Sequence, residues 1–301
     1  MWGLTVLNEP DVCHEHDNTF PWTCLAMNGT QQRDFIKHDL GPLLFGSFNN
    51  NSQYKDLVLM AYDTGLKDML SYVTPILSDP EAAKYVAGLG FHWYTTTAEN
   101  RRQLDELNEK YPNKFQLATE ASLGGSPNGD GNWEKFNHYV DDIIKDLNQH
   151  SVGWVDWSLA KDPQGNPNWA HNRIDPSIVV NPTVPEYYKQ PMYYAVGHFS
   201  RFITPGSIRL HHSIANNIIV KQEHYQQSKN EKNKNETSID VHLPLVQVTV
   251  FIRPDNGTVV QVFNPTTQTA TIEIHDLAIH PINNSMTAIV ESEALQTFIY
   301  Y

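Results

Sequence analysis

The chain has 301 residues, with 21 Lys and Arg against 34 Asp and Glu, which gives a formal net charge of −13. That balance argues against a nucleic-acid partner, because phosphate backbones are bound by basic surfaces. No apolar stretch reaches the roughly 18 residues expected of a transmembrane segment, and the length is sufficient for one large domain or two ordinary ones.

The first part of the chain, residues 1–204, alternates short β-rich runs with amphipathic helical patterns. The β-rich runs are Gly3–Leu7, Leu57–Tyr62, Val86–His92, Phe115–Glu120 and Val152–Trp157. The helical patterns are Gln31–Leu44, Leu66–Leu77, Asn100–Lys110, Asn132–Asn148 and Gln190–Phe202. This alternation predicts a parallel sheet with right-handed crossovers. An open doubly wound sheet would also fit five strands, but no glycine-rich phosphate loop follows any of them.

The second part, residues 205–301, begins after Thr204-Pro205-Gly206 and has a different pattern. β-branched and aromatic runs are separated by turn signals, and the runs are Ile208–Lys221, Leu245–Arg253, Thr258–Phe263, Thr269–Ile274, Thr287–Glu291 and Thr297–Tyr301. Short strands at this spacing predict an antiparallel β-sandwich. Within it, His224–Ser238 is polar and nearly devoid of apolar residues, so we expect a surface loop there.

Two carboxylates stand at the ends of predicted strands. Glu9 closes the first run, and Pro10 prevents that run from continuing as a hydrogen-bonded strand. Glu120 ends the fourth run. Catalytic groups of (β/α) barrels sit at these strand ends, and two carboxyls there can flank a glycosidic bond. The alternative is that each is an ordinary solvated glutamate in a β-to-α loop.

Aromatic and acidic residues follow the same strand ends. His92 and Tyr94 end the third run and Trp157 the fifth; such rings can line a sugar site and such polar groups can position a carboxylate. Trp93 and Trp154 are interpreted as core packing, and the lone acids Asp63 and Asp156 as caps or salt-bridge partners. We find no metal-ligand spacing, nucleophile elbow or phosphate loop, and we expect neither a metal nor a cofactor.

Two further features bear on the cellular compartment. Cys13 and Cys24 either bridge a short loop after Glu9 or remain free thiols. Five Asn-x-Ser/Thr sequons are present, at Asn28, Asn50, Asn235, Asn256 and Asn283. Their number favours a secretory route with N-glycosylation, which requires a signal peptide that residues 1–10 do not show.

Several long collinear motifs resemble the glucosylceramidases of glycoside hydrolase family 30. They are Trp2–Pro10, Asp79–Tyr85, His92–Tyr94, Thr119–Ala121, Gly153–Trp157, Pro167–Trp169, Tyr188–Tyr194 and Gly197–Ser200. The similarity is dense to about residue 205 and weaker in the predicted sandwich. It implies a (β/α)8 barrel, of which this chain carries about strands 4–8, with an attached β-sandwich.

The resemblance also implies roles for individual residues. Glu9 matches the general acid/base of a retaining β-glucosidase that acts on glucosylceramide, and Glu120 matches its nucleophile. Residues that fall on substrate-binding positions are Asn8, for the sugar 2-hydroxyl, and Asp63, His92, Tyr94, Trp157 and Asn172. A lysosomal location, a saposin-type activator and an anionic phospholipid surface are implied as well.

The chain departs from the family in three ways. Barrel strands one to three, with an aspartate and a tryptophan that hold the glucose 4- and 6-hydroxyls, fall before Met1 in the resemblance. We therefore expect this chain alone to be poorly soluble or inactive, since half a barrel leaves two sheet edges open. Gly65 stands near a family glutamine, and Ser122 stands where the family has a cysteine.

Two other functions remain open on the sequence. One is a short paralogue that binds lipid, glycan or an activator protein without hydrolysis; retention of both glutamates speaks against it, and loss of the ligands for the 4- and 6-hydroxyls speaks for it. The other keeps the family chemistry but acts on a different β-linked glycan. A sequence upstream of Met1 that carries the missing strands would favour the glucosylceramidase.

Overall fold

The computed structural model describes residues 1–12, 25–46, 54, 56–124, 131–168, 173–214, 246–276 and 285–301. The chain forms two compact units, Met1–Tyr194 and Ala195–Tyr301. The boundary lies inside helix α8 (Pro191–Phe202), which the helical pattern at Gln190–Phe202 predicted. Across the described ranges, none of the helices combines the length and apolar character needed to cross a bilayer.

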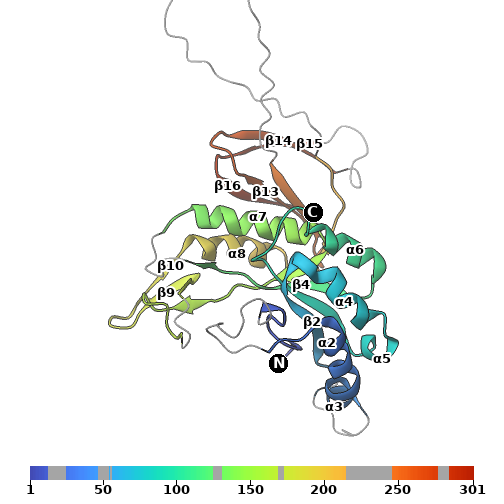
Figure 1. Cartoon of the computed structure of the whole chain (residues 1–301). Helices are drawn as coiled ribbons and strands as arrows, with labels where there is room; N and C mark the ends of the chain where they lie inside the picture. Colours follow the sequence, from blue (N-terminus) through green and yellow to red (C-terminus); the bar gives the residue numbers. More distant parts are fainter. Residues whose placement is uncertain are drawn as a thin grey trace, which may run out of the picture. The chain divides into compact units, whose positions relative to one another are not determined.

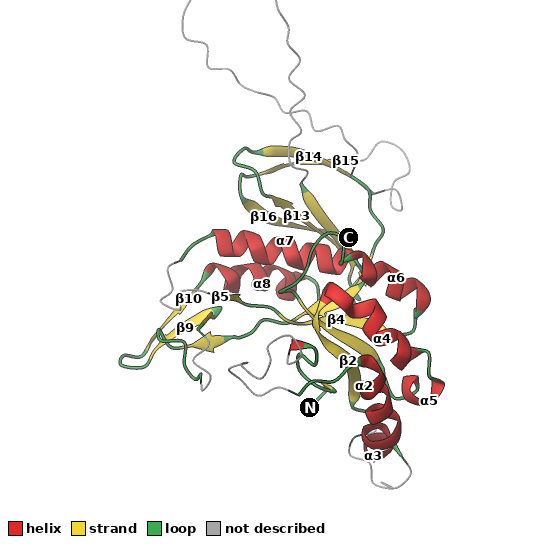
Figure 2. Cartoon of the chain, in the orientation of Figure 1, coloured by secondary structure: helices red, strands yellow, loops and turns green. Residues whose placement is uncertain are grey.

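The first unit is built on a five-stranded parallel sheet, in the order β1-β2-β3-β4-β6. Figures 1 and 2 label two of its strands, β2 and β4. The strands are β1 (Gly3–Thr5), β2 (Val58–Gly65), β3 (Gly88–His92), β4 (Phe115–Glu120) and β6 (Ser151–Trp154). All five predicted strands are confirmed, and their order in the sheet follows the chain. Consecutive parallel strands have their carboxyl ends at one edge of the sheet.

The connecting helices match the helical patterns, except that α5 was not predicted and one predicted helix is divided. They are α2 (Gly29–Phe35), α3 (Gly41–Phe45), α4 (Met69–Leu77), the short α5 (Pro80–Ala83), α6 (Arg102–Lys110) and α7 (Glu134–Asn148). The predicted helix at Gln31–Leu44 is divided by a π-helical turn at Ile36–Leu40. Pro42, at the start of α3, has no N–H to donate to the preceding turn, so the regular hydrogen-bond ladder is interrupted there.

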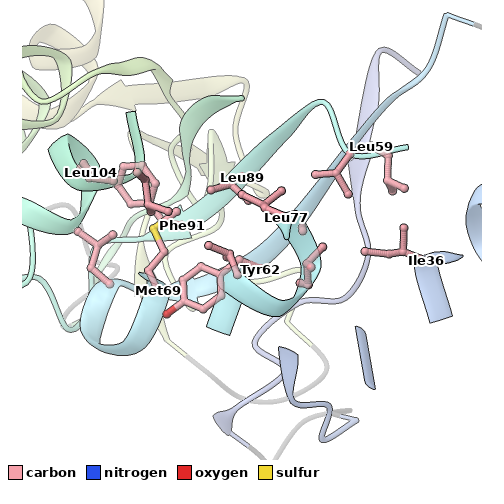
Figure 3. Close-up of a cluster of buried hydrophobic side chains, with 14 of the residues drawn as sticks. Ile36, Leu59, Tyr62, Met69, Leu77, Leu89, Phe91 and Leu104 are labelled. Carbon is pink, nitrogen blue, oxygen red and sulfur yellow. The ribbon is translucent and has the colours of Figure 1, made fainter. Parts of the chain in front are cut away.

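Helices and sheet enclose one apolar core (Figure 3). Leu89 and Phe91 of β3 are buried, as are Met69 of α4 and Leu104 of α6. Leu104 recurs with Leu107 at helical spacing, so one stripe of α6 faces the core. The core thus holds the strands whose ends carry the polar side chains described below.

Some short strands of the first unit were not predicted from the sequence. β5 (Leu123–Gly124) pairs with β8 (Ile174–Asp175), while β7 (Ala160–Lys161), β9 (Ile178–Asn181) and β10 (Glu186–Lys189) form a separate three-stranded sheet. All four residues of β10 are exposed. A strand without a buried face has no alternation of apolar and polar residues for a sequence analysis to detect.

The second unit is all β. β11 (Ile208–Arg209), β12 (Gln247–Ile252), β13 (Thr258–Asn264) and β16 (Ala294–Tyr300) form an antiparallel sheet, and β14 (Ala270–His275) pairs with β15 (Ser285–Val290). Val260 and Val262 of β13 pack with Ala270 and Val290 of the other pair. The predicted C-terminal β-sheets are therefore confirmed, while His224–Ser238 lies outside the described residues.

Candidate active site

Four polar side chains gather where β1, β2, β3 and β4 end: Glu9, Asp63, His92 and Glu120. Backbone pairing places them. The Glu9 N–H donates to the Asp63 carbonyl at 2.9 Å, and His92 is the register partner of Glu120. Adjacent strand ends therefore bring together residues that are far apart in the chain.

The backbone is irregular at two of these positions. Glu9 has φ of 45°, and Asp63 has φ of 77° beside a register shift between β2 and β3. Such bulges re-aim side chains at sheet ends, and positive φ in non-glycine residues concentrates at functional sites. Gly90 of β3 leaves room for the re-aimed carboxylate, because a Cβ there would lie 3.0 Å from Asp63 Oδ1 and from a methyl group of Thr119.

His92 is the centre of the cluster and is only 1% exposed. Its Nδ1 lies 3.3 Å from Glu9 Oε1, and its Nε2 lies 3.3 Å from Asp63 Oδ1 and 3.9 Å from Glu120 Oε2. Burial lowers the pKa of His92, but the hydrogen bonds to Asp63 and Glu9 and the charge of Glu120 outweigh it and raise the pKa to about 9. The ring is therefore an imidazolium at neutral pH, with both N–H groups donating.

Asp63 is held as a carboxylate beneath this ring. It is 6% exposed and accepts hydrogen bonds from Thr5, from Thr119 at 2.6 Å and from His92. Burial raises the pKa of Asp63, but these donors outweigh it and hold the pKa below its ordinary value. Asp63 is thus a salt-bridge partner of His92, as the sequence analysis expected of a lone acid at a strand end. Its contact with a substrate stays a prediction.

Sequence reasoning missed Thr5 and Thr119. Both are hydroxyl residues within predicted strand runs, Gly3–Leu7 and Phe115–Glu120. A threonine in a buried strand suits β structure whether or not its hydroxyl has a partner, so the residue type alone carries no signal. Its position shortly before a strand-end carboxylate is the feature that could have found it.

Glu120 faces Glu9 across the cluster. One oxygen of each carboxyl and a nitrogen of His92 all lie within 4.8 Å of one another. The Tyr94 hydroxyl donates to Glu120 Oε1 at 3.0 Å. Burial raises the pKa of Glu120, and the His92 charge and the Tyr94 hydrogen bond oppose that rise. Carboxyls this close match retaining glycosidases, whose pair is about 5 Å apart, and not inverting ones, whose gap is about 6.5–9.5 Å.

The trio of Glu9, His92 and Glu120 also has the composition of a metal site. A histidine binds a metal through an unprotonated nitrogen, however, and both nitrogens of His92 lie 3.3 Å from a carboxylate oxygen. In the metal-free cluster the raised pKa of His92, about 9, keeps both ring nitrogens engaged as donors to these carboxylates at neutral pH.

Aromatic side chains surround the cluster. The backbone N–H of Trp157 donates to the Ala121 carbonyl at 2.8 Å, which places this residue, 48% exposed, beside the end of β4. Trp93 and Trp154 contact each other edge to face at 6.1 Å, and both pack on Tyr139. The interpretation of these two tryptophans as packing residues is confirmed.

Asp156 was expected to be a cap or a salt-bridge partner, but the side-chain hydrogen bonds that the structure gives it are with hydroxyl groups. It accepts hydrogen bonds from the Tyr139 hydroxyl at 2.8 Å and from Ser177 at 2.5 Å. Burial raises the pKa of Asp156 to about 6, against these hydrogen bonds. It therefore acts as a structural acceptor beside Trp157.

The other predicted residues are less constrained. Asn8 is exposed beside Glu9. Asn28 is the exposed N-cap of α2, accepting from the Gln31 N–H at 2.9 Å, and Asn256 lies in an exposed turn. The predictions at Asn172, Asn50, Asn235, Asn283, Cys13 and Cys24 lie outside the described residues.

Two hollows lie elsewhere on the first unit. The larger, of about 550 Å³, is lined mainly by β9, β10 and Tyr193. The other, of about 340 Å³, includes Asp11, Tyr62 and Tyr72. Neither is lined by Glu9 or Glu120, so the carboxylate cluster is identified by its chemistry and not by a cavity.

Comparisons with known proteins show the family of this chain. Residues 1–203 match the family model "Glycosyl hydrolase family 30 TIM-barrel domain". "Putative glucosylceramidase 3" of Caenorhabditis elegans is 40% identical over 73% of this chain and 42% of its own length. "Lysosomal acid glucosylceramidase" of Mus musculus is 34% identical over 92% of this chain and 48% of its own length. The chain thus spans less than half the length of these relatives.

Solved structures show the same fold at lower identity. SrfJ of Salmonella typhimurium superposes over 100% of this chain and 57% of its own, with a TM-score of 0.79 and 19% identity. The endo-β1,6-glucanase BT3312 covers 99% of this chain and 58% of its own, with a TM-score of 0.73 and 19% identity. The predicted barrel class is confirmed, and the chain belongs to glycosyl hydrolase family 30.

Proposed function

We propose that this chain carries the two catalytic carboxylates of a retaining β-glucosidase that hydrolyses glucosylceramide to glucose and ceramide. The observation that carries the proposal is the approach of Glu9 and Glu120 to within 4.8 Å, with the buried His92 between them. This spacing leaves no room for a water between carboxylate and sugar, as inversion requires, and suits direct attack by one carboxylate.

In the proposed reaction Glu120 attacks the anomeric carbon while Glu9 gives its proton to the departing glycosidic oxygen. Water then enters, Glu9 takes a proton from it, and the bond between sugar and Glu120 breaks, with net retention. The Tyr94 hydroxyl stabilises Glu120 as an anion through its 3.0 Å hydrogen bond. The positive charge of His92 offsets the negative charge of the two carboxylates as Glu9 loses and regains its proton.

The choice of substrate rests on the relatives and not on the cluster. Proteins named glucosylceramidase match this chain over most of its length. The resemblance implies that Asn8 contacts the sugar 2-hydroxyl and that Trp157, which is exposed, packs on the sugar face. A lysosomal location, a saposin-type activator, an anionic phospholipid surface and N-glycans at Asn28 and Asn256 belong to the same proposal.

The roles of the two glutamates are tested by azide rescue of alanine variants, assayed with a β-glucoside that has a fluorescent leaving group. Glu120→Ala, lacking the nucleophile, should yield the α-glucosyl azide, and Glu9→Ala, lacking the acid/base, the β-glucosyl azide. Exchanged products would reverse the assignment. The assay is run on this chain and on any longer product of its gene.

The outcome of that assay also separates the alternatives. Hydrolysis of the fluorogenic glucoside without hydrolysis of glucosylceramide would indicate another β-glycan as substrate. Binding of glucosylceramide with no turnover by either protein would indicate the non-hydrolytic paralogue. Because burial raises the pKa of Glu120 and this group must be ionised to attack, activity should fall with decreasing pH from above the ordinary glutamate value.

A further inference from the structure

We infer that Ser122 is a positioning residue for the nucleophile: its hydroxyl fixes the Tyr94 hydroxyl so that the tyrosine proton points at Glu120. The inference deepens the proposed function and rests on it for any effect on rate. Tyr94 lies 3.0 Å from Glu120 Oε1 and 3.1 Å from Ser122 Oγ. The three groups therefore form a short chain that ends on the carboxylate.

The number of protons on the three groups determines which group donates in each of the two hydrogen bonds. An ionised Glu120 can only accept, and the phenol of Tyr94 has one proton, which the geometry assigns to Glu120 Oε1. The second contact of the phenol oxygen must then be accepted from the Ser122 hydroxyl. Ser122 donates to Tyr94 and Tyr94 donates to Glu120.

Ser122 is itself held in place. It is 7% exposed, and its carbonyl oxygen accepts the indole N–H of Trp93 at 3.1 Å. Trp93 contacts Tyr139 edge to face at 5.3 Å within the aromatic cluster. The serine hydroxyl is thus presented to Tyr94 from a backbone anchored to buried rings, and not from a free loop.

A donor on the phenol oxygen polarises the O–H bond, so the hydrogen bond that Tyr94 gives to Glu120 becomes stronger. The other titratable groups that face Glu120 are His92 from β3, Glu9 after β1 and Asp63 from β2. His92 contacts Glu9 and Asp63 more closely than it contacts Glu120, so its charge does not distinguish the nucleophile. The hydrogen bonds from Ser122 to Tyr94 and from Tyr94 to Glu120 end on Glu120 alone. They favour its ionised form and so oppose the effect of burial.

This role predicts a coupling between Ser122 and Tyr94 that packing alone would not produce. Removing the serine hydroxyl should make Glu120 harder to ionise only while the tyrosine hydroxyl is present. Tyr94→Phe should have the larger effect, because it removes the hydrogen bond to the carboxylate itself. A thiol is a weak donor, so Ser122→Cys should lie between serine and alanine.

The experiment is a titration of the Glu120 side-chain carboxyl by NMR in protein labelled with 13C at glutamate carboxyls, with the signal assigned by its loss in Glu120→Gln. Ser122→Ala should raise the Glu120 pKa by about half a unit and Tyr94→Phe by about one unit. In the Tyr94→Phe background, Ser122→Ala should add no further shift. Ser151→Ala, at another buried serine that bonds the Gly153 carbonyl, is the matched control and should leave this pKa unchanged.

An unchanged Glu120 pKa in Ser122→Ala would overturn the inference, as would a shift that persists in the Tyr94→Phe background. If Ser122→Ala does not fold, the smaller shift in Ser122→Cys, and its loss in Ser122→Cys with Tyr94→Phe, decide the question. The titration needs no turnover, so it tests the role of Ser122 separately from the proposed function: coupling in a protein without glucosidase activity would support the role of Ser122 and lend the proposed function no support. In an active protein the acidic limb of the profile of kcat/KM against pH should move upward by the same amount.

Discussion

The two units of the chain differ in whether buried ionisable side chains contact one another. In the first, Asp63, His92, Glu9 and Glu120 face one another at the ends of parallel strands. In the second, the buried polar residues of β13 bind the backbone instead: Gln261 donates to the His198 carbonyl and Asn264 to the carbonyls of residues 268, 290 and 291.

The difference follows from strand direction. Parallel strands with helical crossovers bring many carboxyl ends to one edge, where side chains from distant segments can form a charged cluster. Antiparallel strands have no such shared edge of carboxyl ends, and the buried amides of β13 are satisfied by backbone carbonyls, several of them from distant parts of the chain. Ionisable side chains that contact one another are candidates for chemistry, whereas amides bound to backbone stabilise a fold.

The strongest test of this difference replaces a glutamate by glutamine in each unit and compares the effects on kcat. Glu120→Gln or Glu9→Gln should lower kcat of an active protein by at least about 10³-fold, because each removes a group that acts in the transition state. Glu273→Gln, at an exposed residue of β14, should change it less than about twofold. A comparable loss in Glu273→Gln would show that the second unit takes part in the chemistry.

Replacing a buried apolar side chain by alanine in each unit compares their contributions to the free energy of unfolding. Leu89→Ala, at a 1% exposed residue of β3, should lower the free energy of unfolding by about 3–4 kcal/mol, and Val262→Ala in β13, which removes fewer carbons, by about 2 kcal/mol. Denaturant unfolding measures both. Leu89→Ala should also slow hydrolysis because β3 carries His92, while equal slowing in Val262→Ala would contradict the separation of the two roles.

The charged cluster should make stability depend on pH. The folded-state pKa of His92, raised to about 9 from 6.5, gives a stabilising contribution that is complete below about pH 6.5 and is lost as pH rises through 9. The lowered pKa of Asp63 acts in the other direction, so its contribution is present above the ordinary aspartate value and is lost as pH falls below it. The free energy of unfolding should therefore fall at both extremes.

Urea unfolding of the wild type and of His92→Gln separates these contributions. Between pH 6 and pH 10 the wild type should lose about 3 kcal/mol more than the variant does. A matched substitution at the exposed His275 of the second unit, His275→Gln, should leave the wild-type curve unchanged. Parallel curves for wild type and His92→Gln would mean that the ring is not a buried cation.

The smallest expected effect concerns a turn of the second unit. Asn256 has φ of 65° between Arg253 and Gly257, whose backbones are joined by a 2.9 Å hydrogen bond. Asn256→Ala should cost about 1 kcal/mol, because a Cβ disfavours this region and alanine lacks the polar side chain that tolerates it. Asn256→Gly should be close to neutral, and thermal unfolding of the pair would show whether backbone conformation alone is responsible.

Much of the molecule follows from its sequence. The alternation of β-rich runs and amphipathic helices predicted all five parallel strands, and the turn-separated runs after residue 205 predicted the C-terminal β-sheets. Glu9 and Glu120 could be selected because each ends a strand, and in a parallel sheet such positions share an edge. These signals are local, since periodicity and strand-breaking residues act within a few positions of the chain.

The tertiary structure decided what lies between those residues. The bulge at Asp63, the room left by Gly90 and the hydroxyls of Thr5 and Thr119 make His92 a buried cation. Residue type alone does not predict these contacts, because a threonine or glycine in a strand has the same local signal whether or not a distant side chain contacts it. The charge of His92 and the direction of the hydrogen bonds to Glu120 depend on contacts between four strands, and only folding brings those strands together.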